Sequence, residues 1–343
     1  MLIKILKTLV IFPLGLTILA ICLWMAGALY YDVGQRTVWG WLWVVVWSGF
    51  VAVICFVVRP IWLSAIIILG IFLLFLVWWF SQKPSHDREW EPNFGKLPRF
   101  VVDGDNLTAH NVRNTEYRTL TDYDPRYETR RYKISNLRGV DVLILDWGAA
   151  GATHPMIVFD VREDGNLCFS IEVRFRKGEK YDMYRSLYRQ NELIFVASDE
   201  RDAILLRTKY ANGQDICLYR LQSSMDNIND LLWEYIEQVN DLYESPEWYN
   251  ILTANCTTSI YRKRRNKLTW DWRILFNGKL DEMLYDWKRL YQGMPFEELK
   301  KASWINGKAN SANEATFSHD IRKGLPGFET KEFETTNGPS SIP

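Results

Sequence analysis

The chain contains the uninterrupted apolar stretch IWLSAIIILGIFLLFLVWWF at residues 61–80, which has no charged side chain. Two comparable runs precede it, at residues 9–31 and 39–58. Each run has about 20 residues or slightly more, roughly what a helix rising ~1.5 Å per residue needs to cross a hydrocarbon layer of ~30 Å. The sequence therefore predicts a transmembrane region at residues 1–82 with three helices.

The first apolar run has one alternative interpretation. Lys4 and Lys7 precede it, as basic residues precede the apolar core of a cleaved secretory signal peptide. Such cores usually have only ~7–15 residues, and here two further spans follow. We therefore expect the first helix to be retained.

Charge is divided unevenly between the apolar part of the chain and the rest. The 343 residues include 41 basic and 41 acidic side chains, for a formal net charge of +0. Residues 1–82 hold four of the basic and one of the acidic side chains, so they carry +3 and the remainder carries −3. A dedicated nucleic-acid-binding domain usually has a strongly basic face, so we expect no nucleic-acid partner.

Composition narrows the class of protein further. A hydrophobic share of 48% and a charged share of 24% are near the globular average and exclude a disordered or collagen-like chain. The five cysteines form no C-x-x-C pair, so they indicate neither a zinc site nor a disulfide framework. We expect no metal and no cofactor.

Basic residues near the span ends predict the orientation of the chain. Lys4 and Lys7 precede the first span and Arg59 joins the second to the third, and the positive-inside rule places all three in the cytoplasm. Three crossings then place everything after residue 80 on the opposite side. Tryptophans lie near the span ends, as in interfacial aromatic belts: Trp39, Trp41, Trp43, Trp78 and Trp79.

Strand patterns come first and helical patterns later in the part after the spans, which predicts the α+β class. Residues 83–98 are polar with three prolines and are expected to form a stalk, 99–328 a folded domain and 329–343 a disordered tail. The pair Asp164-Gly165 predicts a hairpin turn at 162–166. Strands are predicted at 127–134, 140–147, 156–161, 167–175, 193–197, 203–208 and 216–221, and helices at 225–243, from 256 onward and at 280–291.

The stretch WYNILTANCTT at residues 248–258 carries the strongest chemical signal. It places Cys256 after Asn255 at a turn-to-helix junction. A thiol at a helix N-terminus feels the positive end of the helix dipole and unpaired N–H groups, which lower its pKa and offer an oxyanion site. Cys256 is thus a candidate nucleophile. The alternative is a small core cysteine beside an asparagine cap.

A thiol nucleophile needs a base, and the chain has four histidines. His154 has the best context, because it opens a predicted strand where a side chain can face a cleft. The neighbouring strand presents Ser170, Glu172 and Arg174 on one face, at a spacing of two residues. Glu172 is a candidate to orient the imidazole, and a salt bridge between Glu172 and Arg174 is the alternative.

Residues 89–328 resemble the Lnb N-terminal periplasmic domain family of bacterial envelope proteins. This resemblance implies a papain-like thiol-enzyme fold of the circularly permuted NlpC type, in which the histidine precedes the cysteine. Pro155, directly after His154, departs from the family pattern. The matching motifs, in order, are Arg138-Gly139-Val140-Asp141, the glycine-rich approach to His154, the stretch SIEVR at 170–174, Lys177-Gly178-Glu179, Glu192-Leu193, Asp199-Glu200-Arg201-Asp202 and the residues 249–258.

The resemblance also implies an activity, N-acylation of bacterial lipoproteins, with Cys256 and His154 as the catalytic pair. A phospholipid of the bilayer would donate the acyl chain through a Cys256 thioester, and the amine of a diacylglyceryl lipoprotein would accept it. The protein would lie in the bacterial inner membrane, with its N-terminus in the cytoplasm and the later domain in the periplasm. We assign catalytic roles to Cys256, His154, Glu172 and Asn255 and substrate contacts to Arg174, Thr257 and Thr258.

Two other classes of function fit the same residues. A thiol peptidase or amidase of the cell envelope would use the same pair without a lipid acceptor. A non-enzymatic envelope module would need Cys256 only for packing. Mass spectrometry of lipoprotein N-termini distinguishes the first from an acyltransferase, and the reactivity of the thiol distinguishes the second.

Overall fold

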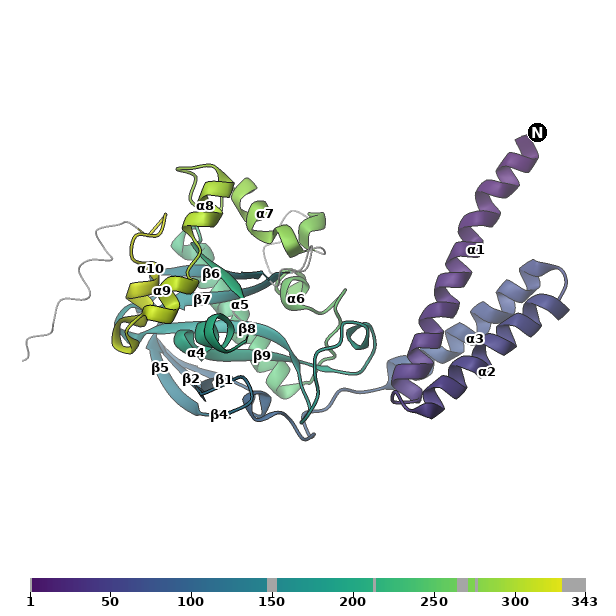
Figure 1. Ribbon diagram of the computed structural model, residues 1–343, viewed down its shortest axis with the longest axis horizontal. Helices are drawn as coiled ribbons and strands as arrows, with labels where there is room; N and C mark the ends of the chain where they lie inside the picture. Colours follow the sequence, from purple (N-terminus) through teal and green to yellow (C-terminus); the bar gives the residue numbers. More distant parts are fainter. Residues whose placement is uncertain (1, 147–152, 212–213, 264–270, 275–276, 329–343) are drawn as a thin grey trace, which may run out of the picture. The chain divides into compact units, whose positions relative to one another are not determined.

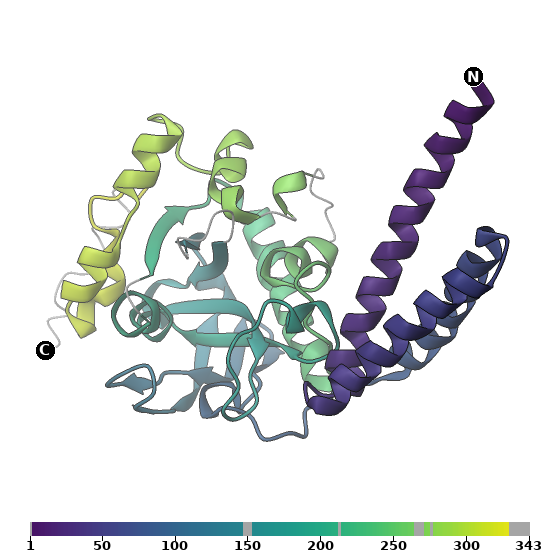
Figure 2. The same ribbon diagram turned by 45° about the vertical axis from the view of Figure 1, so that its right-hand side comes forward.

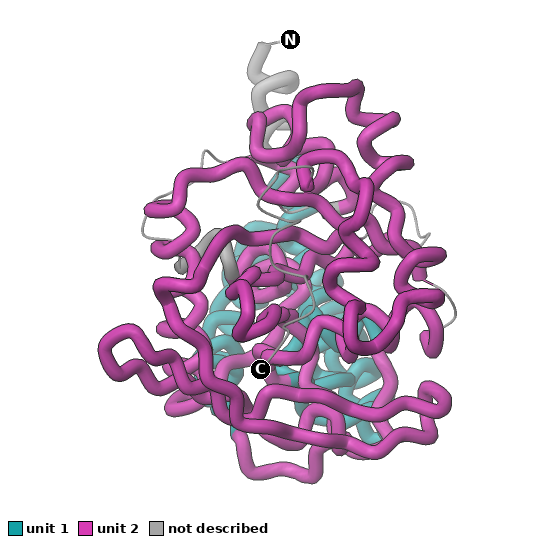
Figure 3. The backbone as a smooth tube through the Cα atoms, turned by 90° about the vertical axis from the view of Figure 1, so that its left-hand side faces the viewer, with its two compact units in different colours: residues 1–85, 182–191 teal, residues 86–181, 192–343 magenta. Residues whose placement is uncertain are grey.

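A computed structural model describes residues 2–146, 153–211, 214–263, 271–274 and 277–328 of the chain. The predicted tail at 329–343, the glycine-rich residues 148–152 before His154 and the turn at 212–213 lie outside these ranges. The chain forms two compact units (Figure 3). Unit 1 comprises Met1–Ser85 together with Asp182–Asn191, and unit 2 comprises His86–Tyr181 and Glu192–Pro343.

Unit 1 contains the three predicted apolar helices, α1 (Leu2–Ala28), α2 (Val38–Val57) and α3 (Ile61–Ser81) (Figure 1). A π-helical turn at Leu29–Val33 continues α1. All three helices are long and apolar enough to cross a membrane. They are apolar around their whole circumference, as expected of helices surrounded by lipid. One polar contact between them is the indole of Trp47, which donates to the Cys22 carbonyl at 3.1 Å.

Unit 2 is built on an eight-stranded sheet in the order β1-β2-β9-β8-β7-β6-β10, with β5 also paired to β2. Neighbouring strands are antiparallel except β2 and β9, which are parallel. A separate hairpin joins β3 (Glu116–Tyr117) to β4 (Tyr123–Asp124). The strands of the large sheet are β1 (Arg99–Asp103), β2 (Asn106–Arg113), β5 (Tyr127–Lys133), β6 (Gly139–Asp146), β7 (Thr153–Asp160), β8 (Asn166–Arg174), β9 (Glu192–Asp199) and β10 (Asp215–Arg220).

The central strands are buried on both faces, which explains their near-continuous apolar sequences. Successive side chains of β6 alternate between two hydrophobic clusters: Val142 and Ile144 pack in one, Leu143 and Leu145 in the other. The long helix α5 (Met225–Glu244) covers the first face, where Tyr235 packs against the rings of three strand phenylalanines. This alternation determines which residues of β7 and β8 share a face.

Shorter helices complete unit 2 (Figures 1 and 2). The second cluster includes residues of α4, α9 and α10, which cover the other face of the sheet. The α+β class and the three apolar helices are therefore confirmed, whereas the structure does not test the papain-like permutation. The helices are α4 (Glu200–Leu205), α6 (Cys256–Lys263), α7 (Leu280–Asp286), α8 (Phe296–Ala302), α9 (Asn306–Ser311) and α10 (Phe317–Arg322).

Most predicted elements lie where the patterns placed them, and the hairpin at 162–166 is confirmed, with Gly165 at φ +91°. The strand predicted at 203–208 is wrong. This segment is α4 followed by a π-helical turn at Leu206–Tyr210. The Asp199 side chain accepts a hydrogen bond from the Arg201 N–H at 2.8 Å and so caps α4. The helix predicted at 280–291 ends earlier, at Asp286.

Candidate functional site

Two asparagines build the turn that precedes Cys256. The Asn250 side-chain oxygen accepts from the backbone N–H groups of Leu252 and Thr253 at 3.0 and 3.1 Å, which closes the turn. The Asn255 side-chain oxygen accepts from the N–H groups of Thr257 and Thr258 at 2.9 and 2.8 Å. Asn255 thus caps α6, and Cys256 becomes the first residue of that helix.

The Cys256 thiol is buried, with 6% of the residue exposed. Burial raises the pKa of the Cys256 thiol to about 11, although hydrogen bonds from Thr257 and from the backbone N–H groups of both residues lower it. The carboxylate of Glu172 raises it further. The expectation of a lowered thiol pKa is therefore wrong, because desolvation of the thiolate outweighs the helix N-terminus. The resting thiol is neutral at neutral pH.

His154 belongs to a hydrogen-bonded chain of three side chains. Ser170 donates its hydroxyl proton to the Glu172 carboxylate at 2.7 Å. The Ser170 oxygen lies 2.7 Å from His154 Nε2, and because its only proton is used, it accepts the Nε2–H. This arrangement favours the imidazole tautomer with a proton on Nε2 and a lone pair on Nδ1. Glu172 therefore reaches the imidazole through Ser170, and its orienting role stays a prediction.

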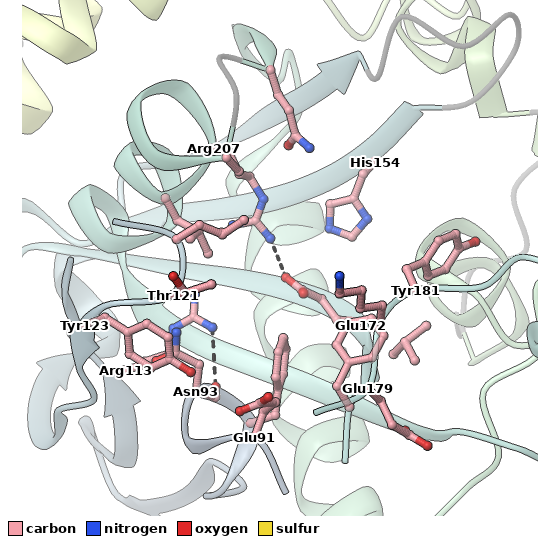
Figure 4. Close-up of a pocket in the computed structure, with 18 of the residues that line it drawn as sticks. Glu91, Asn93, Arg113, Thr121, Tyr123, His154, Glu172, Glu179, Tyr181 and Arg207 are labelled. Carbon is pink, nitrogen blue, oxygen red and sulfur yellow. Dashed lines mark hydrogen bonds and ion pairs between the residues drawn. The ribbon is translucent and has the colours of Figure 1, made fainter. Parts of the chain in front are cut away.

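Arg207 completes the electrostatics of this chain. Its guanidinium forms an ion pair with Glu172 (Figure 4). Burial alone would raise the pKa of Glu172, but Arg207 and His154 hold it at about 2. Burial lowers the pKa of His154 to about 4, with Glu172 opposing the shift and Arg207 adding to it. At neutral pH the site therefore combines an ionised Glu172 with a neutral imidazole, the form that can accept a proton.

Cys256 and His154 are both subject to the charge of Glu172. That carboxylate acts on the Cys256 thiol, on the His154 imidazole and on the Tyr249 hydroxyl. The helix α6, which begins at Cys256, contacts both β7 and β8, the strands of His154 and Glu172. Cys256 packs in the first hydrophobic cluster, whereas the strand register places His154 opposite Leu145, which packs in the second cluster. Both predicted catalytic residues therefore lie near Glu172, and their pairing stays a prediction.

A cavity of about 890 Å³ opens beside this region. His154, Glu172 and Arg207 form a polar part of its wall, as Figure 4 shows. Its volume lies within the ~300–1,000 Å³ usual for small-molecule sites. Apolar and aromatic side chains form much of the remaining wall: Phe94, Leu120, Ile171, Val173, Phe175, Leu206 and Tyr249.

The remaining predicted site residues lie in other surroundings. The Arg174 guanidinium donates to the carbonyls of Phe94 and Gly95, both at 2.9 Å, and stacks over the Trp90 ring. Glu172 pairs with Arg207, so the alternative of a Glu172–Arg174 salt bridge is wrong. The Thr258 hydroxyl donates to the Asn255 side chain at 3.0 Å, within the cap of α6. Substrate contacts by Arg174, Thr257 and Thr258 stay predictions.

Sequence reasoning missed Arg207 and gave Ser170 no role. The period-two pattern on β8 places Ser170 on the same face as Glu172, so the sequence could have identified Ser170 as a link between Glu172 and His154. No sequence pattern identified Arg207, because it lies in the segment that was predicted as a strand. Its guanidinium also donates to the Ala203 carbonyl at 2.9 Å, one turn earlier, which orients it toward β8.

Several residues of the sequence motifs form buried ion pairs. Asp141 pairs with Arg322 at 2.8 Å and with Arg220 at 2.7 Å. Asp202 pairs with the buried Arg113 at 2.7 Å. These motif residues hold helices α4 and α10 against the sheet and take no part in the His154 chain. Within the described ranges, no group of three His, Cys, Asp or Glu side chains is arranged to hold a metal ion.

A comparison with protein families finds a match to part of the chain. No curated protein and no solved structure matches the chain. Residues 123–289, which include His154, Ser170, Glu172, Arg207 and Cys256, match the family model of the Lnb N-terminal periplasmic domain. The resemblance that the motifs predicted is thereby confirmed, and the matched residues follow three helices long and apolar enough to span a membrane.

Proposed function

We propose that this protein is a membrane-anchored thiol acyltransferase that N-acylates bacterial lipoproteins. The observation that supports it most is the His154–Ser170–Glu172 chain, whose carboxylate also acts on the Cys256 thiol. A nucleophile, a neutral base and a group that orients the base are the components of thiol-based acyl transfer.

The first half-reaction acylates the enzyme. His154 Nδ1 takes the proton from the Cys256 thiol as the sulfur attacks an ester carbonyl of a phospholipid. A carbon–sulfur bond forms and the ester carbon–oxygen bond breaks. The leaving lysophospholipid oxygen receives the proton from His154, so the imidazole returns to its neutral form with the acyl chain held as a thioester.

The second half-reaction transfers the chain to the lipoprotein. The neutral α-amine of a diacylglyceryl-cysteine N-terminus attacks the thioester carbonyl, and the carbon–sulfur bond breaks as the amide forms. His154 receives the amine proton and returns it to the Cys256 sulfur. Proton transfer through a positioned base contributes typically ~10²–10⁴-fold to such rates.

In the resting site the Cys256 thiol and the His154 imidazole are both neutral, so no thiolate–imidazolium ion pair is present before substrate binds. The low pKa of His154 and the high pKa of Cys256 mean that the proton moves only as sulfur–carbon bond formation begins. Backbone N–H groups at the start of α6 are the candidate oxyanion donors. The N–H groups of Cys256 and Thr257 both act on the thiol, so we propose these two groups as the oxyanion donors.

The cavity offers a binding site for the acyl chain, and the three helices hold the domain close to its lipid substrates. The apolar wall around Ile171, Val173 and Phe175 suits an acyl chain. Three spanning helices keep the domain at a membrane, which raises the effective concentration of lipid substrates. From the basic residues Lys4, Lys7 and Arg59 we propose the inner membrane, with the N-terminus in the cytoplasm.

Mass spectrometry of lipoprotein N-termini tests this proposal. In a bacterium lacking its own N-acylation activity, the wild-type chain should add one acyl chain to the diacylglyceryl-cysteine amine. Cys256→Ser and His154→Ala should lose that product, whereas Cys168→Ser, at another buried thiol on β8, should retain it. Full N-acylation by Cys256→Ser would refute the scheme. Cleaved peptides without N-acylation would indicate a peptidase or amidase instead.

A further inference from the structure

Ten residues of the later sequence, Asp182–Asn191, belong to unit 1 with the apolar helices. The chain leaves unit 2 after Tyr181, packs against the helix ends of unit 1 and returns at Glu192. A short 3₁₀ turn, Arg185–Leu187, lies at its centre. Asp182 accepts from the Tyr184 N–H at 2.9 Å and so stabilises the entry to this turn. We call Asp182–Asn191 the anchor segment.

Aromatic stacking attaches the anchor segment to α1 and its π-helical turn. The buried Tyr188 ring stacks on Tyr31, with centroids 5.0 Å apart and planes at 19°, and lies 5.9 Å from the Trp24 ring. Gly27 makes this approach possible, because a Cβ there would lie 1.8 Å from the Tyr188 hydroxyl oxygen. The close packing fixes the position of Tyr188 along α1.

Polar contacts attach the same segment to the end of α3. Asp32 accepts from Gln190 at 2.8 Å and from the indole of Trp79 at 2.7 Å, so one carboxylate joins the segment to α3. The Arg189 guanidinium lies 4.3 Å from the centroid of the Trp79 ring and donates to the Gln82 carbonyl at 2.5 Å. The segment is therefore held at the helix ends by side chains of both α1 and α3.

Two large side chains of the anchor segment face outward. Met183 is 51% exposed and Tyr184 is 63% exposed, whereas Arg185 and Ser186, which follow them, are buried. Single exposed apolar residues are ordinary on a soluble surface. These two differ because their segment is fixed to helices that are themselves able to cross a membrane. An amphipathic tyrosine and a flexible methionine are suited to the boundary between head groups and acyl chains.

We propose that the anchor segment is a lipid-contacting element, which places Met183 and Tyr184 in the interfacial layer of the bilayer. The partner is the phospholipid surface around α1 and α3. Trp79, which the segment covers through Arg189, lies at the end of α3, where interfacial aromatic belts occur. This inference does not depend on the proposed acyl transfer.

Spin-label accessibility in nanodiscs of phosphatidylethanolamine and phosphatidylglycerol tests the proposal on the full chain. Met183→Cys and Tyr184→Cys are each labelled, and collisions with oxygen, which partitions into lipid, are compared with collisions with a water-soluble nickel chelate. Leu74→Cys, at a 74% exposed position of α3, is the lipid reference, and Glu298→Cys, on the exposed surface of α8, is the water reference. The wild-type chain, treated in parallel, reports labelling of native cysteines.

The proposal predicts that the oxygen-to-nickel ratio at Met183 and Tyr184 exceeds the Glu298 value severalfold and approaches the Leu74 value. Ratios equal to that of Glu298 would overturn it, because the segment would then face water. Low collision rates with both reagents would also overturn it, because they would indicate a protein contact in place of lipid. Both positions are exposed, so the substitutions leave the packed face of the segment intact.

Discussion

Replacing Ser170 by alanine removes the link between His154 and Glu172 while leaving both of those side chains in place. The Ser170 oxygen lies 2.7 Å from His154 Nε2, and both residues are buried. A buried donor that loses its partner costs about 1–3 kcal/mol. Since each 1.36 kcal/mol on a barrier is tenfold in rate, we expect kcat for acyl transfer to fall about 10–100-fold.

The assay uses purified full-length protein in phospholipid nanodiscs, with a diacylglyceryl peptide as acceptor. The effect should appear in kcat and little in KM, because Ser170 orients the base and is not expected to hold the substrate. Ser170→Thr keeps the hydroxyl and should recover part of the rate. Cys168→Ser, two residues earlier on the same face of β8, is the matched control and should stay near wild type.

A spectroscopic readout separates positioning from simple loss of fold. Selective ¹⁵N labelling of histidine should show His154 with its proton on Nε2 in the wild type and a shift toward the other tautomer in Ser170→Ala. A wild-type rate together with an unchanged tautomer would refute the reasoning. Loss of activity only in proportion to loss of folded protein would refute it as well.

Three further predictions follow from the same contacts. The rate of Cys256 alkylation by chloroacetamide should still increase between pH 7 and 9, because the thiol pKa is about 11; a rate that levels off near neutral pH would contradict this. Glu172→Gln should lower the apparent pKa of the thiol, because it removes a negative charge that acts on the thiolate. The rate of acyl transfer should fall on the acid side near pH 4, because His154 must be neutral to act as a base and its pKa is about 4; a fall near pH 6.5 would argue against the burial of His154. Because the folded protein lowers this pKa from 6.5, the contribution of His154 to the free energy of unfolding is lost as the pH falls from about 6.5 toward 4. Gly27→Leu should displace Tyr188 and expose the peptide bonds after Arg185 and Arg189 to trypsin, whereas Gly49→Leu, at an open position on α2, should not. Equal cleavage of the two variants would contradict the packing of the anchor segment against α1.

The spanning helices could be predicted from sequence because the membrane imposes a local requirement. Every residue from 61 to 80 must be compatible with lipid, so one window of sequence decides the element. The central strands could be predicted for a similar reason, since both faces of β6 and β7 are buried and each strand contains a run of consecutive apolar residues. The hairpin turn at Asp164-Gly165 could be predicted from these two residues alone.

Elements whose identity depends on distant contacts were harder to predict. The apolar residues 203–206 fit a buried strand and a buried helix equally, and the cap at Asp199 was the signal that distinguished them. Arg207 was missed as a consequence. The anchor segment depends on Tyr188 fitting against Gly27, a contact 161 positions apart that no local pattern reports.

For Cys256, too, local sequence determines one property and distant contacts determine another. The position of Cys256 at the start of a helix could be read from the sequence, because Asn255 is a strong cap residue. Its pKa could not be predicted, because the shift depends on how deeply the folded chain buries the sulfur and on the Glu172 carboxylate of β8. Sequence identified the candidate nucleophile, and only the fold determines its protonation state.

The central claim is that Cys256 carries the acyl chain. Purified full-length protein in nanodiscs, given phospholipid but no lipoprotein, should release lysophospholipid and gain the mass of one acyl chain on the tryptic peptide that contains Cys256. Hydroxylamine should remove that mass, and Cys256→Ala should never acquire it. Lipoprotein N-acylation that proceeds at the wild-type rate in Cys256→Ala, or without any hydroxylamine-sensitive adduct on Cys256, would contradict the account.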